Sequence, residues 1–416
     1  MKQLKIVIIV FLGLFAVYLG SLMWISISMG KGFVYQGHSG VKVGDIDVGE
    51  IRVGDIDAGE IRVGNADITW TAGSNFSLAF EKEVAAEEIR GLRIDYSMNS
   101  NDILIYQGDG DSVLIREYMN FTPGENDIST VELGDGQLRI KGKRRNSFFF
   151  LFGAQSKDGY TEIYLPAGFM ENLQDFQAQT VSGEVLSEIP FVNCGSFSVS
   201  STSGDIFFPG AVAEKINVST TSGDIRLTAV SGNIQISTVS GDIMVDRGLS
   251  AAAFSTTSGD IWVGEADGDI KAGTTSGGVM MGRIDGDVSV NTTSGDIRAE
   301  NMTGTFRLGS TSGEIVVEGE AVSGTASTVS GDIRIFTGEL AGDLKLSTTS
   351  GSASIELPES ASFALDFDST SGECRTFFDE MLSFNKRGNK AQGKYGGGEY
   401  AVTFSTTSGD LRITKR

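Results

Sequence analysis

The chain has 416 residues, with 33 Lys and Arg against 54 Asp and Glu, and its formal net charge is −21. This acidic balance excludes nucleic acid as an expected partner, because a protein that binds a phosphate backbone needs clustered cations. Two Cys and one His leave too few ligands for the usual zinc sites and too few bases for the usual Ser or Cys nucleophiles, so we expect no metal, no cofactor and no enzyme.

The N-terminal stretch is typical of a membrane anchor. Residues 6–27 form an uncharged, mostly apolar run that is long enough to cross a bilayer as a helix. Lys2 and Lys5 precede this run, so the positive-inside rule places the N-terminus in the cytoplasm and the rest of the chain outside. A cleaved signal peptide is the alternative, but the run exceeds the usual apolar region of about 7–15 residues. We therefore predict a cytoplasmic stub and a single-pass signal-anchor transmembrane helix within 1–32.

Two regions of different character follow the anchor. Residues 41–68, "VKVGDIDVGEIRVGDIDAGEIRVGNADI", carry a ten-residue repeat, and we assign 33–68 to a β stalk or linker. Residues 69–180 contain less regular stretches of alternating polar and apolar residues, such as "LRIDYS" and "SVLIREY", which are typical of strands. We predict that this region caps a stack of strands, because an open end of such a stack exposes unpaired strand edges.

A basic and aromatic stretch interrupts the predicted capping region. In "KGKRRNSFFFLFGAQSKDG", residues 141–159, a basic cluster precedes an aromatic run; the candidate site residues here are Lys143, Arg144, Arg145, Phe148, Phe149 and Phe150. Such a loop could dock on a membrane surface or on a partner protein. A strand with a buried aromatic run is the alternative interpretation, and the sequence leaves both open.

Residues 181–416 are dominated by a Ser-Gly repeat. Ser-Gly pairs recur at one constant interval over a long central stretch, beginning at Ser222, Ser240, Ser258, Ser276, Ser294, Ser312 and Ser330. Half-period echoes, such as "ADGDI" around Gly268 and "IDGDV" around Gly286, divide each period into two units of about nine residues. The chain therefore repeats a strand-and-turn unit, two to a period.

Polarity alternates within each unit. In "SGDIRL", Ile225 and Leu227 point one way while Asp224 and Arg226 point the other, so each unit is a short strand with one apolar face. A single strand and turn cannot bury that face, but stacked units can. We therefore predict an all-β fold, a parallel β-solenoid with coils of about 18 residues whose two sheets face each other across an Ile, Val and Leu core.

Stacking at about 4.8 Å places each residue beside its equivalent in the next coil. One column would hold Thr220, Thr238, Thr256, Thr274, Thr292, Ser310 and Thr328, and we expect each hydroxyl to donate to the next. A second column would hold Asp224, Asp242, Asp260, Asp296 and Asp332, whose carboxylates repel one another. We expect Arg226, Arg298 and Arg334 on the same face to relieve that repulsion. Calcium is an alternative for the Asp column, although the Gly-Gly-x-Gly-x-Asp spacing of calcium-binding β-rolls is absent.

Three features near the ends of the repeat lead to further expectations. Cys194 and Cys374 would lie about nine coils apart, too far for a disulfide, so two free packed thiols are predicted. Residues 377–400 lengthen one interval to nearly two coils and are predicted as an irregular coil with a basic loop. The closing "LRITKR" ends on charges, a usual protection of a strand edge.

Three stretches carry a resemblance to a known family. They are "TEIYLPAGFMENLQDFQAQTVSGEV" at 161–185, the repeated "STTSGDI" and "GKYGGGEYAVTFSTTSGDLRI" at 393–413. Over about residues 90–413 the chain resembles the bacterial putative-adhesin β-strand-repeat family, a domain of unknown function in envelope proteins of Gram-positive bacteria. The resemblance implies a membrane-anchored or exported β-solenoid, and some members are encoded beside envelope-stress signalling systems. It supplies no catalytic residues, and the repeat at 41–68 departs from its usual pattern.

Two functions remain open from the sequence. The first is a non-catalytic cell-surface protein that binds a cell-wall or host-surface ligand through an outward column, for which the candidate binding residues are Arg226, Trp262, Arg298 and Arg334. The second is an accessory regulator that binds a membrane sensor through the transmembrane helix or the 141–152 loop. An enzyme is not expected, because six successive coils carry no insertion that could wall a cleft.

Overall fold

The computed structural model describes residues 60–63, 66–69, 76–145, 158–248, 250–384 and 389–416. The chain forms two compact units, 1–76 and 77–416. In the first, β1 (Glu60–Val63) and β2 (Ala66–Thr69) pair as an antiparallel hairpin, so the end of the predicted stalk is β structure. The predicted membrane anchor and most of the predicted stalk lie outside the described residues. Within the described part, none of the helices has the length and apolar character needed to cross a membrane.

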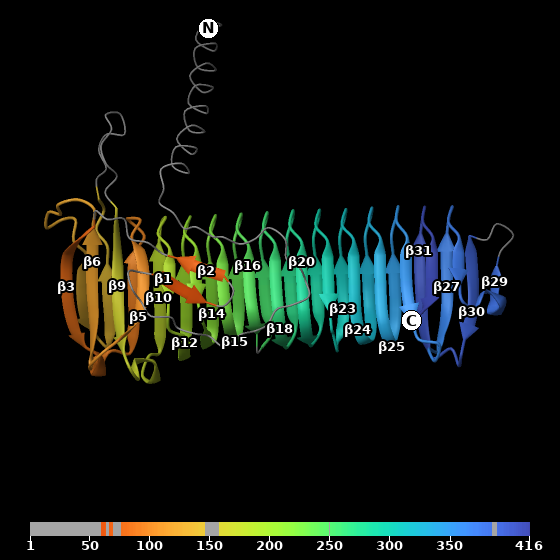
Figure 1. Ribbon diagram of the computed structural model, residues 1–416, viewed down its shortest axis with the longest axis horizontal. Coiled ribbons are helices and arrows are strands. Elements are labelled where there is room, and N and C mark those ends of the chain that lie inside the picture. Colours follow the sequence, from red (N-terminus) through yellow and green to blue (C-terminus); the bar gives the residue numbers. More distant parts are fainter. Residues whose placement is uncertain (1–59, 64–65, 70–75, 146–157, 249, 385–388) are drawn as a thin grey trace, which may run out of the picture. The chain divides into compact units, whose positions relative to one another are not determined.

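The second unit is all-β, and its strands form one mostly parallel sheet of 30 strands (Figure 1). The central strands stack in two rows. Row A contains β12 (Phe191–Ser200), β14 (Ala211–Ser219), β17 (Ala252–Ser255), β19 (Ile270–Gly273), β21 (Val288–Asn291) and β23 (Thr305–Gly309). Row B contains β13 (Ile206–Phe208), β16 (Ile243–Gly248), β18 (Ile261–Asp267), β20 (Val279–Asp285), β22 (Ile297–Glu300) and β26 (Ala353–Leu357). Three longer strands run through both rows: β15 (Ile225–Ser237), β24 (Ile315–Ser327) and β25 (Ile333–Ser347).

The register of row B confirms the predicted coil length. The row pairs a series of inward residues, one from each successive repeat: Ile225, Ile243, Ile261, Val279, Ile297, Ile315 and Ile333. These side chains are at most 2% exposed, and inward residues of both rows belong to one hydrophobic core. Burial of each such side chain contributes about 1.5–3 kcal/mol. The alternation seen in the sequence therefore places the apolar residues between the rows.

The Thr column lies at the corner where row A turns into row B, but its hydroxyls do not donate to one another as expected. Thr238 Oγ1 donates to the carbonyl of Gly223 in the preceding coil at 3.1 Å, and it accepts the N–H of Gly241 at 3.2 Å. The donation to a glycine carbonyl recurs at Thr220, Thr256, Thr274, Thr292, Ser310 and Thr328. Each hydroxyl therefore fastens one coil to the preceding one through the backbone, and these hydroxyls are buried.

At the N-terminal end, stacking begins inside the region predicted as a cap. The coil formed by β4 (Gly91–Tyr96) and β5 (Asp102–Gly108) lies between two others, the pair β8 (Gln137–Lys141) and β9 (Gly159–Pro166) and the pair β10 (Asp175–Thr180) and β11 (Val185–Ser187). Antiparallel pairings then add β3 (Ser77–Ala85), β6 (Ser112–Met119) and β7 (Thr130–Gly134). Stacked coils therefore lie on both sides of residue 180, the predicted boundary between the cap and the solenoid. The short helices here are η1 (Ala86–Glu88) and η3 (Phe169–Glu171).

At the C-terminal end, the last two strands return into the stack. β31 (Tyr400–Thr406) pairs with β25 on one side and with β27 (Phe363–Ser369) on the other. β32 (Leu411–Lys415) lies likewise between β26 and β28 (Cys374–Thr376). "LRITKR" is therefore not a sheet edge, and the expectation that its charges protect one was wrong.

The segment predicted as an irregular coil, 377–400, is also different in the structure. It contains η4 (Asp379–Met381), β29 (Leu382–Phe384) and β30 (Lys390–Tyr395). β30 pairs antiparallel with β27 and β29, so the segment adds two antiparallel strands beyond β27. This hairpin, and not the C-terminus, provides the last strand of row A.

Both cysteines are free and buried, which confirms the prediction of two unpaired, packed thiols. Burial raises the pKa of Cys194 to about 11 and that of Cys374 to about 12. A thiol with such a pKa stays protonated at neutral pH, so both residues serve as packing groups in the core.

Candidate functional site

The predicted outward residues share one column on row B. The register places Arg226, Met244, Trp262, Met280, Arg298, Val316 and Arg334 on successive coils. Arg226, Trp262 and Arg298 are half-buried, and Arg334 is exposed. The structure therefore brings the four predicted residues into line along the stack, and their role in binding stays a prediction.

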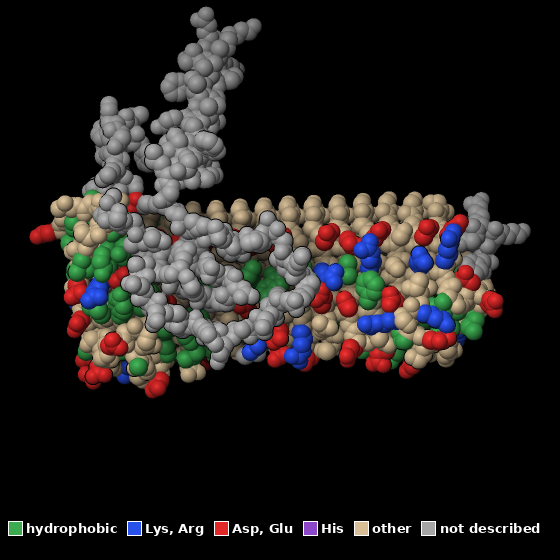
Figure 2. All heavy atoms as spheres, in the orientation of Figure 1, with side chains coloured by type: hydrophobic (Ala, Val, Ile, Leu, Met, Phe, Trp, Pro, Cys, Tyr) green, Lys and Arg blue, Asp and Glu red, His purple; other side chains and the backbone are tan. Residues whose placement is uncertain are grey.

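The arginines of this column have acidic partners of their own. Arg226 lies 3.9 Å from Asp246, and Arg298 contacts Glu300 and lies 3.9 Å from Glu318. These carboxylates lie on the far side of the arginine column, two outward columns away from the column of Asp224 and Asp296, which we call the Asp ladder. Two members of the arginine column contact residues in the ladder column: Arg334 pairs with Glu314 at 2.8 Å, and further along the stack Arg375 pairs with Glu373 at 2.8 Å. Basic side chains likewise stand beside acidic ones over the C-terminal coils of the face in Figure 2.

Relief of the Asp ladder comes mainly from the backbone, which corrects the expectation that the arginines provide it. Asp224 Oδ1 accepts the N–H of Asp242 at 2.8 Å, and Asp242 Oδ1 accepts the N–H of Asp260 at 2.7 Å. Asp296 and Asp332 accept N–H groups of the next coil in the same way. A hydrogen bond from an N–H stabilises a carboxylate, so each Asp fastens one coil to the next.

Trp262 stands in the uncharged middle of the column. Its neighbours on adjacent coils are Met244 and Met280, both half-buried. Gly264 lies beside the indole ring, because a Cβ at that position would lie 2.9 Å from the ring atom Cη2. Met280 is followed two positions later by Gly282. Met244, Trp262 and Met280, which we call the Trp262 platform, form a partly exposed apolar surface between two ion-paired arginines.

At its N-terminal end the ladder column is more deeply buried. The backbone N–H of Glu184 donates to Asp102 at 3.0 Å, but Glu184 Oε2 is buried without a hydrogen-bond partner. Burial, reinforced by the charges of Asp102 and Asp205, raises the pKa of Glu184 to about 9. The folded protein therefore keeps this carboxyl protonated at neutral pH.

A Glu184→Gln variant should be more stable than the parent above about pH 5, by a margin that grows toward pH 9. Below the ordinary pKa of 4.5 both folded and unfolded chains hold the proton, and the charge costs nothing. Between 4.5 and about 9 only the unfolded chain releases it, so the parent loses stability as the pH rises. Thermal unfolding at pH 4 and pH 8 measures the difference. Equal stabilisation at both pH values would contradict the assignment.

The basic and aromatic loop is only partly described. Phe148, Phe149 and Phe150 lie outside the described residues. Lys143 Nζ donates to the carbonyl of Glu125 at 2.9 Å, and Arg144 is exposed.

Arg145 is not available to a membrane or partner, because it belongs to a buried polar network. Its guanidinium lies 2.9 Å from Glu117 Oε1, and the two side chains are 4% and 0% exposed. Arg145 also donates to Asn101 Oδ1 at 2.6 Å, and Ser129 donates its N–H and hydroxyl to Glu117 at 2.8 Å each. A buried ion pair with these additional hydrogen bonds is a structural feature of the capping strands. A surface contact by the described part of this loop would therefore rest on Lys143 and Arg144.

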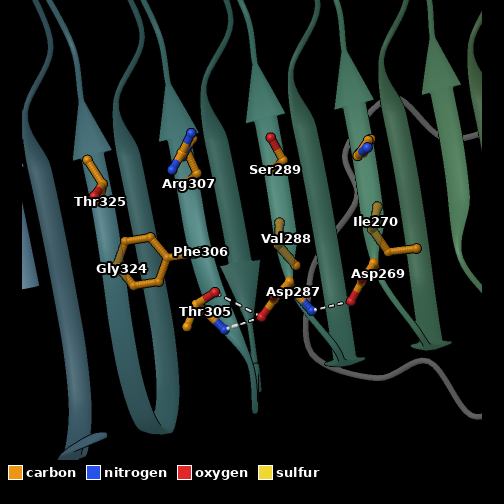
Figure 3. Close-up of a pocket in the computed structure, with 11 residues that line it drawn as sticks. Asp269, Ile270, Asp287, Val288, Ser289, Thr305, Phe306, Arg307, Gly324 and Thr325 are labelled. Atoms are coloured by element: carbon orange, nitrogen blue, oxygen red, sulfur yellow. Dashed lines mark hydrogen bonds between the residues drawn. The ribbon is translucent and has the colours of Figure 1, made fainter. Parts of the chain in front are cut away.

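Sequence reasoning missed a groove on the outward side of row A (Figure 3). It has a volume of about 460 Å³ and crosses β19, β21, β23 and β24. Its lining residues are Asp269, Ile270, Lys271, Asp287, Val288, Ser289, Thr305, Phe306, Arg307, Gly324 and Thr325. The signal in the sequence was the Asp-Gly-Asp form of two half-period echoes, which places acidic residues at this corner.

One irregularity of the repeat borders this groove. Gly324 pairs with Phe306 in the inward column. The coil after Phe306 therefore has no side chain at the position where Phe306 has an aromatic ring. Its φ of 146° is a conformation that favours glycine. Val322 pairs with Leu340 in the next coil, but Gly324 pairs with Leu344, so the register shifts between them. The groove therefore ends where the coil becomes longer.

The described residues hold no group of three or more His, Cys, Asp or Glu arranged to bind a metal ion. The Asp carboxylates of the ladder are used by backbone N–H groups, as described above. The calcium alternative therefore receives no support from the part of the chain that the structure describes.

Comparison with known proteins finds one matching family model and several similar solved structures. Residues 89–279 and 253–414 each match the family model described as Toastrack DUF4097. Similar solved structures include a putative cell adhesion protein from Clostridium sporogenes, 10% identical over 82% of this chain and 100% of that chain, with a TM-score of 0.16. Putative adhesins from Parabacteroides distasonis and Parabacteroides merdae are 14% and 13% identical, each over 68% of this chain and over 97% and 96% of theirs, with TM-scores of 0.32 and 0.27. No curated protein matches the chain.

Proposed function

Because this chain belongs to the Toastrack DUF4097 family, we propose that it is a non-catalytic, adhesin-like binding or structural protein of the bacterial envelope. In this proposal residues 1–32 anchor the chain in the cell membrane by one helix, and the stacked coils lie on the outer side. The ligand is a cell-wall component or a molecule of a host surface. The uncharged run at 6–27 and the two lysines before it support the topology.

The observation that carries the proposal is the Trp262 platform. The coils on both sides of Trp262 keep one repeat length without an insertion, so this part of row B presents a straight face and no walled cleft. Charges next to the platform are already paired, as Arg226 is with Asp246 and Arg298 with Glu300. Partly exposed Trp and Met side chains are the residue types that contribute most to contacts with a partner surface.

A Trp262→Ala variant is expected to bind isolated bacterial envelopes at least about tenfold more weakly than the parent chain, because the half-buried indole is the largest apolar group of the platform. Sedimentation of the full chain with envelopes measures the affinity. The matched control is Val316→Ala, three coils further along the same column. Equal loss in both variants, or no loss in either, would contradict the proposal.

The alternative function is an accessory regulator that binds a membrane sensor in envelope-stress signalling. It draws on the exposed Arg144 and the aromatic residues that follow it. Photo-crosslinking in living cells separates the two functions, with one probe at Met280 on the platform and another at Phe150. Capture of envelope or host material at Met280 supports the adhesin-like function, whereas capture of a membrane protein at Phe150 alone supports the regulator.

A further inference from the structure

The cations beside the row A groove differ from Arg226, Arg298 and Arg334 of row B, each of which has an acidic partner. Among the described residues, no ion pair involves Lys271, Arg307 or Lys345, and all three side chains are exposed. They share an outward column with Ser289 and Thr325, so cations and hydroxyls alternate from coil to coil. The column therefore presents a row of hydrogen-bond donors, and its three cations have no ion-pair partner in the described part of the chain.

The opposite edge of the groove is a row of acceptors. Asp269 Oδ1 accepts the N–H of Asp287 at 3.0 Å, and Asp287 Oδ1 accepts the N–H and hydroxyl of Thr305 at 2.9 and 2.8 Å (Figure 3). The bonds from Thr305 lower the pKa of Asp287, which keeps this carboxylate ionised. The second oxygen of each carboxylate has no protein partner within the described ranges. Each Asp is thus held in place by one oxygen and offers the other.

The two rows run along the stack and are about 7 Å apart, since Asp269 directly precedes β19 and Lys271 is the second residue of that strand. Adjacent donors or acceptors follow at about 4.8 Å, and the four coils from Lys271 to Thr325 span about 14 Å. An extended chain that lies along the groove would therefore meet a donor at each coil on one side and the carboxylates of Asp269 and Asp287 at two successive coils on the other.

From this arrangement we propose that the row A groove binds a neutral, hydroxyl-rich glycan chain. Two carboxylates and two cations in the lining cancel, so a polyanion would meet the Asp row and a polycation would meet Lys271 and Arg307. An apolar peptide would find polar residues in the outward column. A sugar hydroxyl both donates and accepts, which matches both rows. This site lies in the opposite row from the Trp262 platform and goes beyond the proposed function.

Calorimetric titration of the full chain with hexasaccharides tests the proposal. The probes are three neutral chains, cellohexaose, maltohexaose and chitohexaose, with hyaluronan hexasaccharide as the polyanion and a glucosamine hexamer as the polycation. We expect at least one neutral probe to bind with a Kd of about 1 mM or lower, and its affinity to change by less than about twofold when salt is raised. Absence of binding by all three neutral probes would overturn the proposal, as would stronger, salt-sensitive binding of either charged probe.

Matched variants locate the site. Lys271→Ser combined with Arg307→Thr introduces the residue types that neighbouring coils carry in the same column, so folding is expected to be retained. Binding of the neutral probe should fall at least about tenfold, since two of the four donors lose their charge and reach. Arg412→Ser on β32, which is exposed, lies outside the groove lining and has Ser354 as its neighbour in the same column, is the control and should leave binding unchanged. Equal binding by the double variant and the parent would remove the groove as the site.

The experiment also separates this proposal from the proposed function. Envelope binding that depends on Trp262 can persist when the groove variants lose the oligosaccharide, and the reverse can occur. Thermal unfolding of each variant shows whether a lost signal comes from an unfolded chain.

Discussion

A Gly277→Ala variant is expected to lose about 3 kcal/mol of folding free energy, the upper end of the usual range for an overpacked site. A Cβ at this position would lie 1.8 Å from the carbonyl oxygen of Gly259 in the preceding coil. That oxygen cannot move aside freely, because it accepts the hydroxyl of Thr274 at 3.1 Å. The same contact, at 1.7–2.1 Å, recurs at the corner glycines Gly204, Gly223, Gly241, Gly259, Gly295, Gly313, Gly331, Gly351, Gly372 and Gly409, so it belongs to the corner itself.

The adjacent glycine supplies the control. A Cβ at Gly278 would have its nearest neighbour at 3.5 Å, which is ordinary van der Waals contact. Gly278 also stands where other coils carry Asp, so a side chain is compatible with this position. Denaturant unfolding of both variants measures the difference. If Gly278→Ala destabilises the chain as much as Gly277→Ala, the close approach of coils at the corner is not what selects glycine.

A chain that ends at Gly398, and so lacks β31 and β32, is expected to lose the fold of its C-terminal coils. The deletion removes the buried Val402, Phe404, Leu411 and Ile413, whose burial contributes about 6–12 kcal/mol. It also opens a gap in the middle of the stack, because β27 and β28 lose the strands that join them to β25 and β26. Hydrogen exchange should become fast throughout 363–384 and 389–395, and the exposed edges of β25 and β26 should promote aggregation.

A shorter deletion is the control for this experiment. A chain that ends at Thr414 loses only Lys415 and Arg416, and with them the exposed ion pair between Lys415 and Glu359. We expect its exchange pattern and thermal midpoint to stay close to those of the full chain. The chain that ends at Gly398 could instead retain protection of 363–384 and 389–395. That result would show that these strands stay packed on the stack without β31 and β32.

The repeat spacing predicted the coil but not the order of the coils. Equal intervals between Ser222 and Ser330 indicate which residues stack, and the register agrees at each step. The motif "STTSGDL" at 405–411 is nearly the same as the others, however, so it is compatible with several neighbours in the stack. Its position between β26 and β28 depends on the length and hairpin pairing of 377–399, which the repeat does not encode.

Contacts between side chains were harder to predict than contacts between coils. The Asp column was found from the sequence, yet its carboxylates accept backbone N–H groups, whose direction follows from the turn and not from residue type. The partners of Arg226 and Arg298 are Asp246 and Glu300, which lie in a third outward column that the Ser-Gly-Asp repeat does not mark. Arg145 reads as part of a basic surface cluster, and only the three-dimensional arrangement places it beside Glu117.

The carboxylate column has a consequence for how this protein can change in length. Each Asp carboxylate accepts a backbone N–H of the coil after it. Each coil therefore has a carboxylate acceptor on one side and a backbone N–H donor on the other. Loss or duplication of one whole repeat by unequal recombination within the gene would still place an acceptor side against a donor side. The stack would then shorten or lengthen by one step of about 4.8 Å. A change by an odd number of residues would turn every later strand over and expose its apolar face. Evolution can therefore change the length of this stack only in whole coils.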